Sequence, residues 1–220
     1  MFANRFAAGV QLAQFLEPYS TEETVLLAVP RGGIQVAYPI ALRLKKPLDV
    51  IIPRKIALPE YPELALGAVT FDGGVDLNQE LVDKFNLSSA DVEALVRPAV
   101  AEIRRRLLLY RGQKLSVVLA GHDVILIDDG LATGYTMIAA IRSVRNNIPR
   151  RITVAVPVSP SSTCDHIRTL VDQLVVLEHP TESSFAVGAY YSDFRDLPDE
   201  ELVRLLNESS PISQSSAQSQ

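Results

Sequence analysis

The sequence is poor in cysteine and in long hydrophobic runs. Its 220 residues include a single cysteine, Cys164, so the chain has no intramolecular disulfide framework and a reducing compartment is the simpler expectation. Nothing resembles a membrane span, and residues 1–10 lack both the basic start and the continuous apolar segment of a secretory signal. We therefore expect a cytoplasmic protein without a membrane partner.

Several functional motifs are absent as well. A net charge of −5 argues against a general nucleic-acid-binding surface, and no helix-turn-helix segment is visible. The three histidines have no metal-ligand spacing and give Cys164 no evident catalytic partner, so we expect a small buried thiol there. Because the chain also lacks a P-loop lysine motif and a phosphoryl-accepting nucleophile, an α/β phosphatase or kinase is disfavoured.

A hydrophobic content of 47% is enough for a sizeable core. We expect one domain over residues 1–208, whereas residues 209–220 are rich in serine and glutamine and predict a disordered tail. Buried strands are expected at residues 24–29, 48–52, 124–127, 151–156 and 174–177. Helices are expected at residues 35–44, 88–107, 135–144 and 199–206, with a further helix capped by Ser161 or Ser162.

Two of these helices carry specific expectations. The helix over residues 35–44 should begin late or kink, because Pro39 falls inside it. An N-terminal helix should pack through apolar residues at helical spacing, namely Phe2, Phe6, Val10, Ala13 and Leu16.

The most informative stretch is residues 124–136. Four branched apolar residues predict a parallel strand buried on both faces, and Asp128 and Asp129 follow at its carboxyl end, where open α/β sheets bind ligands. Carboxylates accept hydrogen bonds from vicinal hydroxyls of a sugar. The next residues offer backbone N–H groups, hydroxyls and a helix start suited to a phosphate: Ala132, Thr133, Gly134, Tyr135 and Thr136. The alternative is that the two acids merely cap that helix.

A second candidate anion site follows the strand at residues 24–29. Gly32 and Gly33 allow the backbone to approach a ligand closely, and Arg31 can donate a bidentate pair of hydrogen bonds. A glycine pair by itself is weak evidence, since many loops contain one. Its position upstream of Asp128 strengthens the interpretation.

Residues 53–63 contain three prolines and predict a long, stiffened loop of the kind that serves as a lid. Arg54 and Lys55 at its start are candidates for contacting an anion, although a solvated basic pair is the alternative. Residues 65–70 and 75–77 predict a hairpin with a glycine-rich turn.

Aromatic residues gather after the last expected strand, at Phe185, Tyr190, Tyr191 and Phe194. Their rings can stack on a flat heterocycle or pack this loop onto the core, and both interpretations stay open.

Residues 124–136 closely resemble the phosphoribosyl-pyrophosphate signature of the type I phosphoribosyltransferases: four apolar residues, two acids, two further positions, then small-Thr-Gly-x-Thr. The match departs at Gly130, where that signature usually has an aliphatic residue. The resemblance extends to about Leu206. It implies an α/β fold, a doubly wound and mostly parallel sheet flanked by helices, with a small hood at about residues 178–197.

The resemblance also implies a reaction. The 5-phosphoribosyl group would move from phosphoribosyl pyrophosphate to a nitrogen heterocycle with release of pyrophosphate, and Mg²⁺ would be carried chiefly by the donor. Asp128 and Asp129 would hold the ribose hydroxyls, and residues 132–136 the 5-phosphate. The pyrophosphate would be held by Arg31, Gly32 and Gly33, with Arg54 or Lys55 covering it.

The acceptor follows less directly from the residues. Residues 54–59 and 131–136 resemble the adenine phosphoribosyltransferases, but the whole chain is more similar to an uncharacterised bacterial branch of the family. We take a purine as the expected acceptor and nucleotide salvage as the expected role. A homodimer is usual in the family and is expected here. The alternative function is a regulator that binds phosphoribosyl pyrophosphate without turning it over.

Overall fold

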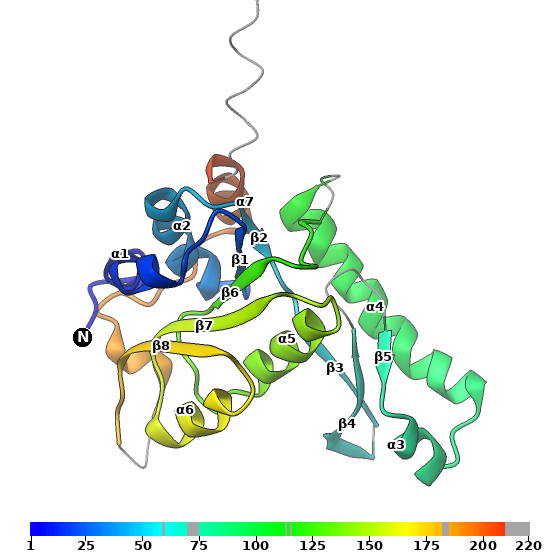
Figure 1. Ribbon diagram of the computed structural model, residues 1–220. Coiled ribbons are helices and arrows are strands. Elements are labelled where there is room, and N and C mark those ends of the chain that lie inside the picture. The colour runs from blue at the N-terminus through cyan, green and yellow to red at the C-terminus, as the bar shows by residue number, and fades with distance from the viewer. Residues whose placement is uncertain (59, 70–74, 113, 115, 182–184, 210–220) are drawn as a thin grey trace, which may run out of the picture.

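A computed structural model of the chain shows a central sheet between helices and a smaller sheet beside it (Figure 1). The structure describes residues 1–58, 60–69, 75–112, 114, 116–181 and 185–209. Among these residues, no helix has the length and apolar character needed to span a membrane. From position 210 onward, the predicted tail lies outside the described residues.

The central sheet has five strands in the order β2-β1-β6-β7-β8, and every neighbouring pair is parallel. The strands are β1 (Thr24–Ala28), β2 (Leu48–Val50), β6 (Asp123–Ile127), β7 (Arg151–Val158) and β8 (Gln173–Glu178). Both β1 and β6 are buried along their whole length, as their continuous apolar runs predict. All five expected strands are present within a few residues of their predicted ends.

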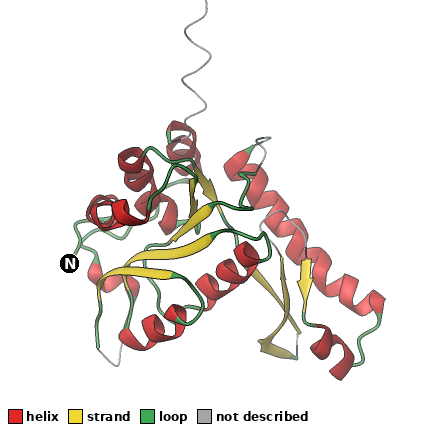
Figure 2. Cartoon of the chain, in the orientation of Figure 1, coloured by secondary structure: helices red, strands yellow, loops and turns green. Residues whose placement is uncertain are grey.

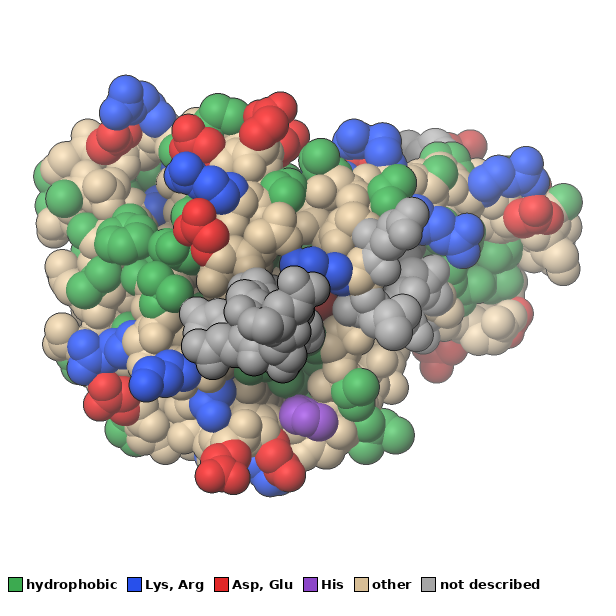
Figure 3. All heavy atoms as spheres, turned by 90° about the horizontal axis from the view of Figure 1, so that it is seen from above, with side chains coloured by type: hydrophobic (Ala, Val, Ile, Leu, Met, Phe, Trp, Pro, Cys, Tyr) green, Lys and Arg blue, Asp and Glu red, His purple; other side chains and the backbone are tan. Residues whose placement is uncertain are grey.

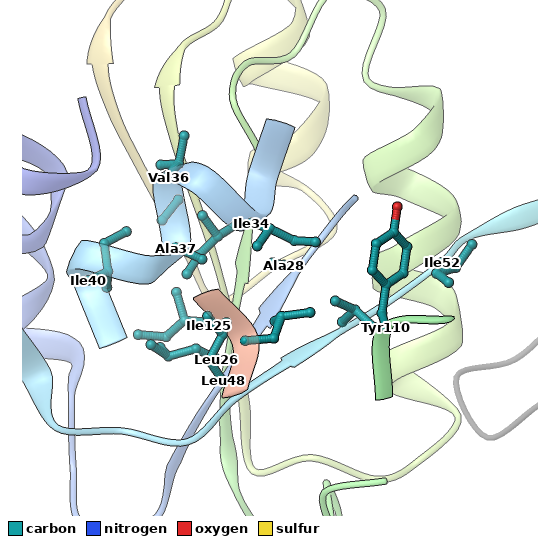
Figure 4. Packing of buried hydrophobic residues seen from close by; sticks show 14 of the residues in the cluster. Leu26, Ala28, Ile34, Val36, Ala37, Ile40, Leu48, Ile52, Tyr110 and Ile125 are labelled. Carbon is teal, nitrogen blue, oxygen red and sulfur yellow. The ribbon is translucent and has the colours of Figure 1, made fainter. Parts of the chain in front are cut away.

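Helices cover both faces of this sheet (Figure 2). On one face, Leu26 and Ile125 pack with residues of α1 (Arg5–Leu16), α2 (Gly32–Leu44), α4 (Ser89–Arg111) and α7 (Asp199–Glu208). Figure 4 shows Leu26 and Ile125 beside Ile34 and Ile40 of α2. On the other face, Leu27 packs with α5 (Tyr135–Arg145) and α6 (Ser161–Arg168). The fold is the doubly wound parallel sheet that the sequence predicts.

The smaller sheet is antiparallel, in the order β3-β4-β5. Its strands are β3 (Arg54–Leu58), β4 (Tyr61–Val69) and β5 (Val75–Leu77). The predicted pairing of residues 65–70 with 75–77 is confirmed, although their turn lies outside the described residues.

The prediction of a long loop over residues 53–63 is wrong. Most of these residues form β3 and the start of β4, in which Ile56 and Leu58 alternate on one buried side. Prolines are tolerated near strand ends and bulges, and register shifts on either side of Ala57 interrupt this pairing. Arg54 therefore lies on a paired strand.

α4 begins as its sequence predicts. The backbone N–H of Asp91 donates to Ser88 Oγ at 3.2 Å, and Asp91 Oδ2 accepts from the Ser88 N–H at 2.9 Å. This reciprocal capping box satisfies two N–H groups that the first turn leaves unpaired. The shorter α3 (Gln79–Lys84) precedes it, and two 3₁₀ turns lie at Glu17–Tyr19 and Val187–Tyr190.

The exposed face of α1 differs from the prediction. Phe2, Ala13 and Leu16 are buried as predicted, but Phe6 and Val10 are 47% and 41% exposed. The buried side of α1 instead also carries Arg5, Ala8, Gly9 and Leu12. The cause is the close approach of α1 to α2: a Cβ added to Gly9 would lie 2.2 Å from the Val36 carbonyl oxygen. Only a glycine fits at this point of contact between the two helices.

Two helix starts also differ. α2 begins at Gly32, earlier than the predicted 35, with Pro39 inside it. α6 begins at Ser161, but Pro160 is its N-cap residue and no side chain caps it, so the predicted serine cap is wrong.

Seen from above, the surface mixes basic and acidic side chains with apolar ones, and no single sign of charge covers this face (Figure 3). Cys164 is fully buried, as predicted, with its Sγ 3.5 Å from His179 Nδ1.

Candidate active site

The two predicted ligand-binding turns meet at the carboxyl ends of β1 and β6. The Val29 N–H donates to the Ile127 carbonyl oxygen at 2.8 Å, which ties the two strand ends together. A Cβ added to Gly32 would lie 2.0 Å from Asp129 Oδ2, and one added to Gly33 would lie 2.7 Å from the Ile127 oxygen. The glycine pair is thus required for the start of α2 to pack against the acids.

Each acid has one carboxyl oxygen engaged by the protein. Asp128 Oδ1 accepts a hydrogen bond from the Asp129 N–H at 2.8 Å, and Asp129 Oδ2 accepts one from Arg5 Nε at 2.7 Å. The two carboxyl groups also interact with each other, which raises the pKa of Asp128 and lowers that of Asp129. Both residues are half-buried, and the second oxygen of each carboxyl is the candidate acceptor for two neighbouring hydroxyls.

The capping alternative does not fit this geometry. Gly134 is the N-cap residue of α5, and neither acid bonds to the first turn of that helix in the described structure. Asp128 and Asp129 therefore stand at the strand end as candidate ligand groups rather than as caps.

Burial raises the pKa of Asp128 well above its ordinary value of 3.8, and the neighbouring Asp129 charge raises it further. Burial also raises the pKa of Asp129, whereas the hydrogen bond from Arg5 lowers it. The two carboxyl groups are consequently unequal, because the direct hydrogen bond from Arg5 favours negative charge on Asp129 rather than on Asp128. A ligand that donates hydrogen bonds would favour the ionised pair.

Arg5 is the main contributor to this site that sequence reasoning missed. It is the first residue of α1, placed there by Asn4, whose side chain accepts the Ala7 N–H at 2.8 Å. Although charged, Arg5 is only 4% exposed. The sequence signal is weak, an arginine in an otherwise apolar first turn, because its partner Asp129 lies 124 positions away.

The aromatic stretch packs against the N-terminal segment and against itself. Tyr191 lies 5.5 Å from Phe2 and 5.1 Å from Phe194, and Phe185 lies 5.4 Å from Tyr190, measured between ring centroids. These contacts favour the packing interpretation of this stretch over stacking on a ligand. The Tyr191 hydroxyl also donates to the Asp129 carbonyl oxygen at 2.6 Å, and because burial raises the pKa of Tyr191, it remains a donor.

The same stretch accounts for the unusual Gly130. A Cβ added there would lie 2.6 Å from Val187 Cγ1 and 3.0 Å from Val158 Cγ1. Val187 thus fills the space that a side chain at position 130 would need. The departure from the signature reflects packing against residues 187–191, with no loss of a polar group.

The candidate phosphate loop opens α5. Thr133, Tyr135 and Thr136 are exposed there, and Gly134 adopts the left-handed φ of 76° that favours glycine. The loop is braced by Thr163 of α6, whose Oγ1 donates to the Ala132 carbonyl oxygen at 2.7 Å. Thr163 also escaped sequence reasoning, because its role depends on packing between α5 and α6.

The candidate pyrophosphate ligand Arg31 is engaged by the segment before α7. Its Nη2 donates to the Leu197 carbonyl oxygen at 2.5 Å, and Nη1 lies 3.2 Å from Asp199 Oδ1. Its Nε is 4.0 Å from Asp196 Oδ2. The structure thus brings Gly32 and Gly33 to the acids but holds the Arg31 guanidinium on neighbouring carboxylates.

The candidate lid residues lie elsewhere. Arg54 is exposed on β3, near α4: the pKa of Glu102 there is lowered chiefly by its hydrogen bond to Arg105, with Arg54 adding a smaller effect. The backbone of Lys55 continues β3, and its side chain is outside the described structure. No recorded contact joins Arg54 to Asp128 or Asp129 among the described residues.

Comparison with known proteins identifies the family. The family model described as "Phosphoribosyl transferase domain" matches residues 5–193. The chain belongs to the phosphoribosyl transferase family. Two curated sequences from two strains of Mycobacterium tuberculosis, both named "Putative phosphoribosyl transferase", are 37% identical to it over 207 residues. These matches cover 94% of this chain and 46% of each relative, so the chain spans about half the length of the curated relatives it matches.

A solved structure shares the fold of this chain. The protein TT1426 from Thermus thermophilus is 37% identical to this chain and superimposes with a TM-score of 0.84, covering 95% of this chain and 99% of that one. The predicted family and fold are therefore confirmed.

The described part of the chain offers no protein-built metal site. Among the described residues, no group of three or more His, Cys, Asp or Glu side chains could hold a metal ion. One oxygen of Asp129 is already paired with Arg5. The residues fit a magnesium ion whose ligands come mostly from donor oxygens and water, as this cation prefers.

Proposed function

We propose that this phosphoribosyl transferase moves the 5-phosphoribosyl group from phosphoribosyl pyrophosphate to a ring nitrogen of a heterocycle, releasing pyrophosphate. The observation that carries the proposal is the contact between the two turns, in which Gly32 and Gly33 pack on Asp128 and Asp129. A diol bound by the acids would have one anion-binding turn on one side and the phosphate loop on the other. That spacing suits a sugar phosphorylated at both ends.

In the proposed reaction, a nitrogen lone pair forms a bond to C1 of the ribose while the bond from C1 to the pyrophosphate oxygen breaks. The electron pair leaves with the pyrophosphate, and the proton on the attacking nitrogen passes to solvent. The free oxygens of Asp128 and Asp129 would accept hydrogen bonds from the ribose hydroxyls and favour positive charge on the ring. Donor-bound Mg²⁺ would supply positive charge to the leaving group.

Residues 132–136 would anchor the 5-phosphate at the start of α5, where Ala132 and Thr133 precede the helix. At the other end, Arg31, Gly32 and Gly33 would hold the pyrophosphate. The Gly33 N–H donates to the Val29 carbonyl oxygen at 3.1 Å, while no partner is recorded for the Gly32 N–H within the described structure. A donor that used Arg31 would have to exchange its contact with Asp199 for one with phosphate oxygens.

Arg54 and Lys55 are proposed to reach the leaving group through movement of the β3–β4 hairpin as a unit, because Arg54 lies on a paired strand. A purine is our first candidate acceptor, with nucleotide salvage as the cellular role, and we propose a homodimer. The engagement of Arg31 by Asp199, and the placement of Arg54 near α4, favour a second candidate function: binding of phosphoribosyl pyrophosphate without turnover.

The deciding experiment measures pyrophosphate release from phosphoribosyl pyrophosphate with Mg²⁺ against a panel of purines, pyrimidines and other nitrogen heterocycles. Release that requires one heterocycle, and is lost in Asp128→Asn/Asp129→Asn, would support the transferase and name its acceptor. Calorimetric binding of the donor without release for any heterocycle would favour the regulator. If the donor does not bind, both functions are excluded.

Replacing Thr163 with valine is expected to weaken donor binding about fivefold, because the change removes the hydrogen bond to Ala132 while keeping the side-chain shape. The measurement is calorimetric titration with phosphoribosyl pyrophosphate and, separately, with ribose 5-phosphate. Thr169→Val is the matched control: it removes a bond of the same kind, from Thr169 Oγ1 to the His166 carbonyl oxygen at 2.8 Å, away from the loop. Equal losses in the two variants would rule out a specific role for Thr163.

A further inference from the structure

Arg5 is a buried cation with every guanidinium nitrogen engaged. Its Nε donates to Asp129 Oδ2 at 2.7 Å, and its Nη1 donates to the Phe194 and Arg195 carbonyl oxygens at 3.1 and 3.0 Å. Its Nη2 lies 3.3 Å from Asp196 Oδ1, and its Cζ lies 3.7 Å above the centroid of the Phe194 ring. The planar group is therefore fixed on its edges and on one face.

The backbone before Arg5 is held as well. The Phe2 N–H donates to the Tyr190 carbonyl oxygen at 2.7 Å, and the Ser192 N–H donates back to the Phe2 oxygen at 2.9 Å. This strand-like pairing joins the N-terminal segment to residues 190–192. Arg5 is consequently a rigid link between α1, the segment after β8, and Asp129.

We propose that Arg5 is a positioning residue for the donor sugar: it fixes the Asp129 carboxyl through Oδ2 so that Oδ1 faces the ribose hydroxyls. This inference rests on the proposed function. A buried ion pair is a costly way to anchor a helix, since apolar residues would do so without removing charges from water. The position of this ion pair favours a role at the site, because the pair lies against the glycine turn. A Cβ added to Gly32 would lie 2.0 Å from Asp129 Oδ2 and 2.8 Å from Arg5 Nε.

The charged groups around Asp129 agree with this role. Asp128 adjoins it on the same turn, and Asp196 reaches Arg5 from the far side, at 3.3 Å. Without Arg5, the Asp129 carboxyl would face two like charges and lose its cationic partner. It would then turn away from Asp128, and the two free oxygens would no longer match a diol.

The test is a double-mutant cycle of Arg5→Met and Asp129→Asn, with donor affinity measured by calorimetry and turnover by pyrophosphate release. We expect Arg5→Met to weaken donor binding about tenfold and to lower kcat/KM about a hundredfold. In the Asp129→Asn background the same change should alter donor affinity by less than about twofold, because its partner is already gone. Arg5→Lys, which keeps the charge but not the fork of donors, should restore part of the affinity.

Arg43→Met is the matched control. Arg43 also pairs with a carboxylate, Glu17 Oε1 at 2.8 Å, but it is exposed and away from the acids. It should leave donor affinity unchanged.

The outcomes separate this inference from the proposed function. If the wild-type protein binds and turns over the donor and Arg5→Met does the same, the inference alone is overturned. Equal losses on Arg5→Met with and without Asp129→Asn would mean that Arg5 only supports the fold, which also overturns it. If the wild-type protein does not bind the donor, both this inference and the proposed function are overturned. Should Arg5→Met fail to fold, Arg5→Lys and Phe194→Leu, which disturb the same contact while keeping the charge, carry the test.

Discussion

Asp128→Asn is expected to lower kcat/KM for pyrophosphate release about a thousandfold and yet to stabilise the folded protein. The loss follows because the neutral amide neither accepts hydrogen bonds as a carboxylate does nor favours positive charge on the ribose. The gain follows because the Asp128 carboxyl is buried beside Asp129, which raises its pKa well above 3.8. An asparagine oxygen can still accept the Asp129 N–H. We expect a gain of about 1 kcal/mol in the free energy of unfolding at pH 7.

The size of this stabilisation depends on pH. A carboxyl whose pKa is raised in the folded state contributes stability below pH 3.8, and that contribution is lost as the pH rises through the raised pKa. Asp128→Asn removes that loss, because its amide does not ionise. The difference in Tm between variant and wild type should therefore be largest near pH 7 and shrink towards pH 4.

Asp129→Asn is the matched comparison. Burial raises the pKa of Asp129 as well, but the loss of its ion pair with Arg5 should outweigh that effect and lower stability. That substitution leaves the buried Arg5 without its carboxylate, and breaking a buried pair in this way costs about 3 kcal/mol. Thermal unfolding of both variants, together with pyrophosphate release, measures the contrast. If Asp128→Asn lowered Tm as much as Asp129→Asn does, the inferred difference between the environments of the two carboxyl groups would be refuted.

Gly32→Ala is expected to destabilise the protein by about 3 kcal/mol and to abolish donor binding. The added methyl group would lie 2.0 Å from Asp129 Oδ2 and 2.5 Å from its Cγ. Asp129 cannot swing away freely, since Arg5 holds it, so either the ion pair breaks or the start of α2 shifts. Both outcomes separate the two turns that the donor would bridge.

The measurement is chemical unfolding of the variant followed by calorimetric titration with phosphoribosyl pyrophosphate. Gly121→Ala serves as the control, because a Cβ there meets no atom within 4 Å and only the left-handed φ of 73° is unfavourable. That variant should lose about 1 kcal/mol and bind the donor normally. A Gly32→Ala protein with wild-type stability and affinity would show that the close packing is dispensable.

The parts of the molecule that the sequence predicted well have local signals. β6 is a run of branched apolar residues, so its burial and the placement of Asp128 and Asp129 at its end follow from neighbouring positions alone. The start of α4 is equally local, since Ser88 and Asp91 are one turn apart. The glycines at 32 and 33 suggested close approach, although the sequence alone did not show that Asp129 is what they approach.

The missed features depend on contacts between distant segments. Nothing near Arg5 in the sequence indicates a carboxylate partner, and the packing of Gly9 on α2 decides which face of α1 is buried. The β3–β4 hairpin was not predicted, because its prolines indicate a loop. Prolines disfavour strands less at a bulge, such as the one in this pairing. The packing of Val187 against Gly130 could not be predicted either, because only the tertiary fold brings these two residues together.

The pairing of Phe2 with Tyr191 also constrains when the molecule can be completed during synthesis. A ribosome releases residues 1–5 long before residues 190–196 exist, so early in translation Arg5 has neither Asp129 nor its carbonyl partners available. Strands β1, β2 and β6 can associate while α1 still lacks its final contacts. The carbonyl partners of Arg5 follow even the last strand, β8, so the docking of α1 around Arg5 belongs among the latest steps of folding.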